Sequence, residues 1–274
     1  MTRIRKRARL YRHFLAATRR MPDKPLALLQ ALWLGVLDAD ALNDVTFLAY
    51  EGQGQDGFAG EEFNFQGFWP WELAAVEAAF DGCRSVLVAG AGGGREVIAL
   101  ARLGFEVTAF DFCAELNVAC RRHLTEAGLT AHILDAPPDR LPEGLGQFDA
   151  VLVGRGFYHH IPGRARRVAF LRACRERMAV DAPIVISDFF VRPVTSQRYQ
   201  RIRSIANLVR RLRRCAESVE LGDWMTDSLQ HAFVQEEIAA EMTDAGFRLE
   251  SFKDSPFGEG SSLAHAIGRA RNDR

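Results

Sequence analysis

The spacing of apolar residues predicts two helices at the start of the chain. Apolar residues recur at intervals of three and four over residues 2–20, which is the helical period, and arginines fill the other faces. The apolar stripe of this amphipathic helix is formed by Ile4, Ala8, Tyr11 and Leu15. Pro22 and Pro25 are expected to break the chain, and residues 26–37 then resume as a strongly apolar helix that should be buried.

A glycine-rich stretch and an aromatic cluster follow. Residues 52–60 hold glycines among Gln and acidic residues and predict a flexible loop. The next segment, residues 63–71, fits neither a regular strand nor a regular helix. Its rings are Phe63, Phe65, Phe68, Trp69 and Trp71. They could form aromatic walls around a ligand or ordinary core contacts of an N-terminal helical cap, and the sequence leaves both interpretations open.

From residue 85 onward, short β-branched runs alternate with helical stretches, which is typical of βαβ units and a parallel sheet. We expect strands at 85–89, 106–110, 131–134, 148–153 and 183–188. We expect helices at 95–103, 114–127 and 164–178. An Arg-rich, helical interruption at 191–231 is followed by a helix at 235–245 and by strands at 247–252 and 263–268, joined by a loop rich in Gly, Pro and Ser.

Charge is distributed unevenly, although the 274 residues include 35 basic and 35 acidic ones. Residues 1–25 hold nine basic residues against Asp23, and eight arginines lie between Arg192 and Arg214. Such clusters attract an anionic substrate, a nucleic acid or an acidic partner, or they are solvated helix faces. We expect the two basic segments to line or cover the entrance for an anionic substrate.

The cysteine count and the lack of long apolar runs narrow the class of protein. The five cysteines are an odd number without Cys-x-x-Cys spacing, so we expect reduced thiols and no metal site. No run of eighteen apolar residues and no signal peptide are present, which predicts a cytoplasmic protein without a membrane partner.

The segment after the first expected strand carries the most information. An apolar strand runs directly into glycines and then into a helix, as in nucleotide-binding folds. A phosphate-binding P-loop would need Gly-Lys followed by Ser or Thr, which is absent. The dinucleotide fingerprint needs a small residue where Arg95 stands, so NAD is disfavoured. Asp111 ends the second strand 21 residues after Gly90, where an acid can accept both hydroxyls of a ribose.

Gly90, Gly92 and Gly94, together with Asp111, resemble the glycine motif of class I, Rossmann-like S-adenosylmethionine-dependent methyltransferases. The resemblance covers about 83–189 and 235–270. It implies an α/β fold with a doubly wound, seven-stranded, mostly parallel sheet and a C-terminal antiparallel hairpin. It further implies an N-terminal helical cap at 1–80 and a cofactor domain at 81–274 with a helical insertion at about 190–234.

The same resemblance implies S-adenosyl-L-methionine as the cofactor and maps its contacts onto this sequence. The implied binding residues are Gly90, Ala91, Gly92, Gly94, Asp111, Phe112, Asp135, Ala136 and Gly154. Val88 departs from the family pattern, because an acid often stands there. The methionine amino group must then find another partner, for which Glu96 and carbonyls near Gly154 are candidates.

His159 and His160 follow the fourth strand at the edge where ligands bind in doubly wound folds. Either could act as a general base, or they could pack structurally and order the loop. Tyr158, Arg155 and Asp188 are further candidates for a catalytic role.

The favoured prediction is methyl transfer to an O or N acceptor on a small molecule of anionic or aromatic character. The alternatives are an RNA or peptide methyltransferase and a non-catalytic protein that binds the adenosine cofactor. The basic clusters motivate the nucleic-acid alternative, but neither an Asn/Asp-Pro-Pro-Tyr motif after the fourth strand nor a Pro-Cys motif is present.

Overall fold

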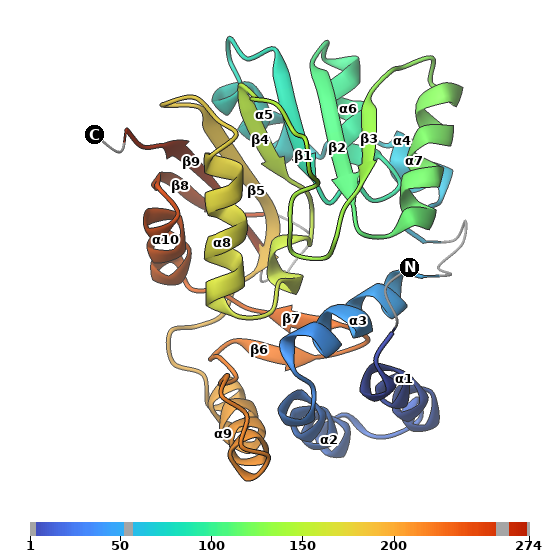
Figure 1. Cartoon of the computed structure of the whole chain (residues 1–274), viewed down its shortest axis with the longest axis vertical. Coiled ribbons are helices and arrows are strands. Elements are labelled where there is room, and N and C mark those ends of the chain that lie inside the picture. The colour runs from blue at the N-terminus through green and yellow to red at the C-terminus, as the bar shows by residue number, and fades with distance from the viewer. Residues whose placement is uncertain (1–3, 52–56, 256–262, 273–274) are drawn as a thin grey trace.

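A seven-stranded sheet forms the centre of the computed structural model (Figure 1), which describes residues 4–51, 57–255 and 263–272. The strand order is β3-β2-β1-β4-β5-β9-β8, and all pairs are parallel except those of β9 with β5 and β8. The strands are β1 (Ser85–Ala89), β2 (Glu106–Asp111), β3 (His132–Asp135), β4 (Ala150–Val153), β5 (Pro183–Phe190), β8 (Phe247–Asp254) and β9 (Leu263–Ala270). The predicted fold class is therefore confirmed.

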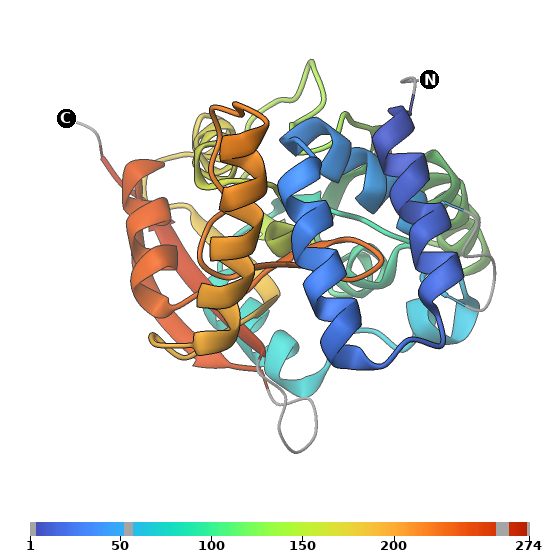
Figure 2. The same cartoon turned by 90° about the horizontal axis from the view of Figure 1, so that it is seen from below.

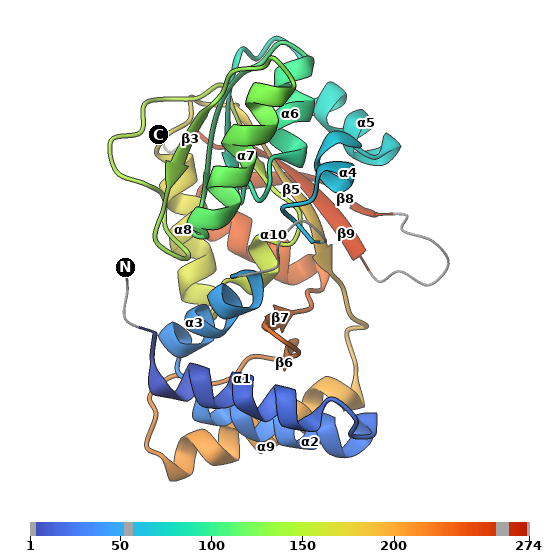
Figure 3. The same ribbon diagram turned by 90° about the vertical axis from the view of Figure 1, so that its right-hand side faces the viewer.

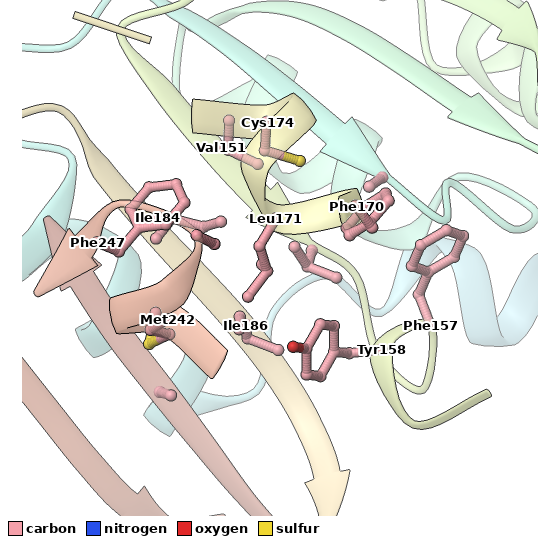
Figure 4. Packing of buried hydrophobic residues seen from close by; sticks show 14 of the residues in the cluster. Val151, Phe157, Tyr158, Phe170, Leu171, Cys174, Ile184, Ile186, Met242 and Phe247 are labelled. Atoms are coloured by element: carbon pink, nitrogen blue, oxygen red, sulfur yellow. The ribbon is translucent and has the colours of Figure 1, made fainter. Parts of the chain in front are cut away.

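Helices cover both faces of this sheet because its central strands are apolar on both sides. One face carries α5 (Pro70–Ala79), α6 (Arg95–Arg102) and α7 (Ala114–Glu126). The other carries α8 (Arg164–Arg175) and α10 (Gln235–Asp244), where Phe170, Leu171 and Met242 pack against the strands and against Tyr158 (Figure 4).

A second layer lies at the carboxyl ends of the strands (Figures 1 and 3). It consists of α1 (Lys6–Thr18), α2 (Asp23–Val36), α3 (Ala39–Tyr50), α9 (Gln197–Leu212) and the two-stranded sheet of β6 (Asp223–Met225) and β7 (Leu229–His231). A hydrophobic cluster of its own joins these segments and includes Tyr11, Leu34, Val45 and Ala206. The N-terminal helices and the 190–234 segment therefore pack together, although they are far apart in sequence.

Four sequence expectations differ from the structure in this layer and beside it. Helix α2 begins at Asp23 rather than at residue 26, because a proline in the first turn of a helix removes no hydrogen bond, so Pro25 is tolerated. Only one face of α2 is buried, and Leu28 and Leu32 are exposed. The segment 63–71, expected to be irregular, is so only at 66–69, because its two ends belong to α4 (Glu61–Phe65) and α5. The segment 191–231 is helical only to Leu212 and ends in the hairpin of β6 and β7.

Parts of three other predictions lie outside the described residues: the start of the first helix before Ile4, the glycine-rich loop at 52–56 and the loop at 256–262. Within the described residues, no helix is long and apolar enough to span a bilayer.

Candidate active site

A cavity opens where the strand order reverses, at the carboxyl ends of β1, β2 and β4. Ligands of doubly wound folds bind at this point. Its walls come from the segments that follow the strands, from the helix α3, from Phe58, and from Leu116 of α7. The lining residues are Asn43, Thr46, Tyr50, Phe58, Gly90, Gly92, Asp111, Phe112, Leu116, Pro138, Asp139, Arg155, Phe157, His160 and Ile161.

The glycine loop after β1 forms the floor of this cavity. Gly90 has a φ of +79°, and a Cβ there would lie 2.7 Å from the ring of Phe157. Gly93 also has no room for a side chain, because a Cβ would lie 2.2 Å from the carbonyl oxygen of Phe58. The loop therefore needs glycine both for its backbone conformation and for the close approach of a neighbouring segment. Sequence analysis did not single out Gly93.

Asp111 lies at the end of β2 beside this loop and is buried. Its carboxylate accepts hydrogen bonds from the backbone N–H groups of Gly92, at 3.0 Å, and Cys113, at 2.9 Å. Burial raises the pKa of Asp111 to about 6, against the lowering effect of these N–H donors. A carboxylate has about four acceptor positions, so Asp111 retains capacity for ligand hydroxyls on the cavity side.

Asp135 is paired with Asp111 in the parallel register of β2 and β3. Asn117, on α7, is fully buried and donates to the Asp135 carboxylate at 2.7 Å and to the carbonyl oxygen of Asp111 at 3.0 Å. The backbone N–H of Ala136 also donates to the Asp111 carbonyl. Asn117 thus holds the ends of two neighbouring strands together, a role that no motif in the sequence indicated.

The other predicted cofactor residues lie next to the cavity without lining it. Ala91 is buried in the core beneath the loop. Gly94 caps α6 and packs on Cys120, while Gly154 packs against the carbonyl oxygen of Gly90. Of the nine predicted residues, those that line the cavity are Gly90, Gly92, Asp111 and Phe112.

Arg95, which stands where a dinucleotide fingerprint has a small residue, forms a buried ion-pair network. Its guanidinium contacts Glu72 at 2.6 and 2.8 Å and Glu96 at 2.6 Å, and it lies 3.9 Å from the ring centre of Trp69. Ser187 also donates to Glu72. Two rings of the aromatic cluster, Phe63 and Trp69, therefore lie against this arginine, and of the 57–71 segment only Phe58 is among the lining residues. Glu96, proposed as a partner for an amino group, is engaged by Arg95.

The two predicted histidines differ in their position relative to the cavity. His160 lines the cavity, whereas His159 is buried behind it, and its Nδ1 has no hydrogen-bond partner within the described residues. The Nδ1 of His160 lies 2.6 Å from the carbonyl oxygen of Leu229, and its Nε2 lies 2.9 Å from the hydroxyl of Tyr50. Since a carbonyl can only accept, Nδ1 carries the proton and Nε2 accepts from Tyr50.

Burial lowers the pKa of His160 to about 4 and that of His159 well below its usual value. Both rings are consequently neutral at pH 7, and His160 presents a lone pair at Nε2 to the Tyr50 hydroxyl. Tyr158, the third member of the predicted motif, is buried away from the cavity and donates to Glu241 at 2.6 Å.

Arg155 and Asp188 form an ion pair at the cavity wall, with 2.7 Å between Nε and the carboxylate. Asp188 sits at a bulge of β5 with a φ of +52°, which is uncommon for a side-chain-bearing residue, and burial raises its pKa to about 6. Its Oδ1 is buried without a hydrogen-bond partner within the described residues. Such backbone conformations and unsatisfied carboxylate atoms concentrate at functional sites.

The roof of the cavity comes from α3, which sequence analysis did not predict. Asp38 caps this helix by accepting from the N–H of Ala41, and this N-cap signal was visible in the sequence. Asn43 donates to Asp139, and Arg166 of α8 binds both Asp139 and Asp40 of α3. These contacts hold α3 across the cavity.

The two basic helices belong to the second layer at the carboxyl ends of the strands, but they do not line the described cavity; that they cover its entrance stays a prediction. Neither α1 nor α9 contributes a lining residue, because both pack on the far side of the second layer. Arg5 pairs instead with Asp40 and Asp44, and Arg210 donates to the carbonyl oxygens at the end of α2.

A cluster of two acidic residues and one histidine was not predicted from the sequence. Ligand atoms of Glu220, Asp223 and His231 lie within 4.8 Å of one another. His231 contacts Asp223 at 2.6 Å, and Glu220 pairs with Arg167 at 2.8 Å. The group therefore serves as an ion-pair network that anchors the hairpin of β6 and β7 to α8.

Comparison with known proteins agrees with this geometry. Residues 86–179 match the family model described as a methyltransferase domain. A ubiquinone biosynthesis O-methyltransferase from Xanthomonas campestris pv. campestris is 32% identical over 117 residues, which are 42% of this chain and 47% of that protein. The chain thus spans about half the length of the curated relatives it matches.

Solved structures match over most of the chain. A SAM-dependent methyltransferase from Methanosarcina mazei has a TM-score of 0.59 at 16% identity and covers 75% of this chain and 99% of its own. The 1,6-didemethyltoxoflavin-N1-methyltransferase of Burkholderia thailandensis, with S-adenosylhomocysteine bound, has a TM-score of 0.62 at 17% identity and covers 86% and 92%. Residues 86–179 are therefore similar to a methyltransferase domain, and the chain has the class I, Rossmann-like methyltransferase fold.

Proposed function

We propose that this chain, with its class I methyltransferase fold, transfers a methyl group from S-adenosylmethionine to an oxygen or nitrogen atom of a small molecule. The observation that carries the proposal is the position of Asp111, a buried carboxylate that lines the same cavity as Gly90, Gly92 and Phe112. The methyltransferase-domain match over residues 86–179 supports the same activity.

The residues present fit this cofactor. Asp111, held by two backbone N–H groups, has acceptor capacity left for the two ribose hydroxyls, and the glycine loop leaves open space beside Gly92. Phe112, next to Asp111, would pack on the adenine, and the Asp135 carboxylate would accept from the adenine amino group. The acceptor would lie between this floor and α3, where Asn43, Thr46 and Tyr50 line the cavity.

Bound S-adenosylmethionine would supply a methyl group already activated by the sulfonium. The protein then has to align the acceptor and exclude water. Tyr50 and His160 together are the residues we assign to the acceptor's proton, because the Tyr50 hydroxyl lines the cavity and donates to Nε2 of His160. The Tyr50 oxygen would accept from an acceptor O–H or N–H. A proton that methylation has made acidic would pass to Tyr50 while the Tyr50 proton passes to Nε2, which a pKa near 4 makes a weak base. His159, behind His160, would support the ring that it contacts.

A calorimetric titration with S-adenosylhomocysteine tests the cofactor assignment. Replacing Asp111→Ala should weaken binding by about 1.5 to 3 kcal/mol, roughly 10- to 150-fold, which is the scale of hydrogen bonds to a charged group. Asp244→Ala, at an exposed carboxylate of α10, is the matched control and should bind normally. Unchanged affinity in folded Asp111→Ala protein would sink the assignment.

Turnover then separates methyl transfer from the alternatives. The proposal expects S-adenosylhomocysteine to form from S-adenosylmethionine with some member of a panel of phenols, hydroxy acids and amines. Tight cofactor binding without turnover on any of them would favour a non-catalytic protein, and turnover on RNA or peptides alone would favour a macromolecular acceptor.

A further inference from the structure

The helices α1, α2 and α9 lie side by side and form one outer face of the molecule, with α2 in the middle (Figure 2). Their inner sides supply Ala8, Tyr11, Leu34 and Ala206 to the hydrophobic cluster of the second layer. Side chains that are exposed on α2 must consequently point away from that cluster and from both flanking helices.

This outer face carries an unusual number of exposed leucines. On α2, Leu28 and Leu32 are four residues apart and 50% and 38% exposed. On α9, Leu208 and Leu212 are also four residues apart and are 58% and 78% exposed, whereas Ile202 and Ala206 are buried. With Leu10 of α1, these residues make up half of the ten large apolar side chains that stand out to solvent in the described residues. Each of the three helices therefore exposes at least one leucine.

The same three helices are rich in basic residues. Residues 4–37 and 197–214 together hold fifteen lysines and arginines and one acidic residue, Asp23, in a chain that is neutral overall. Some of the arginines are engaged, such as Arg7 with Asp38 and Arg213 with carbonyl oxygens of α2. Within the described residues, no ion pair is formed by the exposed arginines Arg9, Arg20, Arg201, Arg211 and Arg214.

We propose that this three-helix face docks on an anionic lipid surface. Leucines on such a face can enter the boundary between headgroups and acyl chains, while arginines around them contact the phosphates. The expectation of no membrane partner was based on the lack of a spanning segment, and a peripheral contact needs none.

Two other occupants fit the face less well. A nucleic acid would match the charge but leave the leucines in water, and Trp33, the indole of these three helices, packs on Tyr11 and Phe14 rather than offering its ring for base stacking. A second copy of the same face would match the leucines but would bring two strongly positive surfaces together.

Vesicle flotation tests the proposal with the full chain. Binding is measured on phosphatidylcholine vesicles with and without roughly one third phosphatidylglycerol, at low and high salt. We expect binding only to the anionic vesicles, weakened by salt because the charge attraction is screened. Leu208→Ser with Leu212→Ser, and separately Arg201→Gln with Arg211→Gln, should each reduce the bound fraction about tenfold or more.

The control is Val118→Ser, at a side chain 64% exposed on α7 beside the central sheet, which should bind as the unaltered chain does. All variants change exposed residues, and thermal unfolding confirms that they fold. Absence of binding to anionic vesicles, or binding that survives the leucine changes, would overturn the proposal. So would RNA binding that is lost with the arginines but not with the leucines, or dimerisation that the leucine changes abolish. None of these outcomes depends on methyltransferase activity.

Discussion

The floor and the roof of the cavity are built in different ways. The floor is formed by short contiguous segments that are held in place mainly by backbone groups. These are the glycines, the paired strand ends and the N–H groups that donate to Asp111. The roof is held by side chains from α3, α8 and the segment after β4, joined by ion pairs and by the contact of Tyr50 with His160. A floor of this kind suits a constant ligand, whereas the roof can change one side chain at a time and so can adapt to different acceptors.

The largest expected effect tests whether the N-terminal segment, through Glu72 of α5, stabilises the glycine-loop floor of the cavity. Glu72→Ala should leave Arg95 buried without its main partner and lower the free energy of unfolding by about 3 to 5 kcal/mol. Urea unfolding measures the loss. Glu77→Ala, at an exposed position on the same helix, should change it by less than about 0.5 kcal/mol. Equal effects of the two changes would show that the buried pair does not couple the regions.

The next effect concerns His160 in the roof. Its pKa of about 4 in the folded chain lies below the ordinary 6.5, so the unfolded chain takes up this proton first as the pH falls. The contribution of His160 is fully present above pH 6.5 and is lost progressively toward pH 4, on the order of 3 kcal/mol in all.

Urea unfolding at several pH values should therefore show a shallower decline for His160→Asn than for the unaltered chain between pH 6.5 and 4. His13→Asn, at an exposed histidine of α1, is the control and should leave the decline unchanged. Parallel curves for the His160 variant would mean that the ring is not held neutral.

The smallest effect tests the separation of floor and roof directly. Tyr50→Phe removes the hydrogen bond to Nε2 of His160 and should cost about 0.5 to 1.5 kcal/mol of stability. Affinity for S-adenosylhomocysteine should stay within about twofold, since the loss lies in the roof. Tyr199→Phe, at a ring that contacts Trp224 in the second layer, serves as the comparison in both measurements. A large drop in cofactor affinity for Tyr50→Phe would show that the roof also holds the cofactor.

The floor of the cavity could be predicted from the sequence, whereas the contacts of the roof could not. The sheet, the glycine loop and the position of Asp111 depend on local patterns, namely apolar strands, glycines and an acid at a strand end, and these were found. The hydrogen bond between Tyr50 and His160 joins residues 110 apart in sequence, and no local pattern encodes it. Arg95 was recognised as a departure from one fingerprint, but its partner Glu72 lies on another helix, so its role needed the structure.

The contact between Arg95 and Glu72 also limits which chimeric proteins, made by exchanging N-terminal segments between relatives, can fold. A cut at residue 80 separates Glu72 from Arg95, and the buried guanidinium beside the glycine loop then keeps only Glu96 of its two acidic partners. Recombining N-terminal segments between relatives should succeed where the incoming segment carries an acid at the position of Glu72, and fail where it does not. Glu72 and Arg95 thus form a matched pair across that boundary.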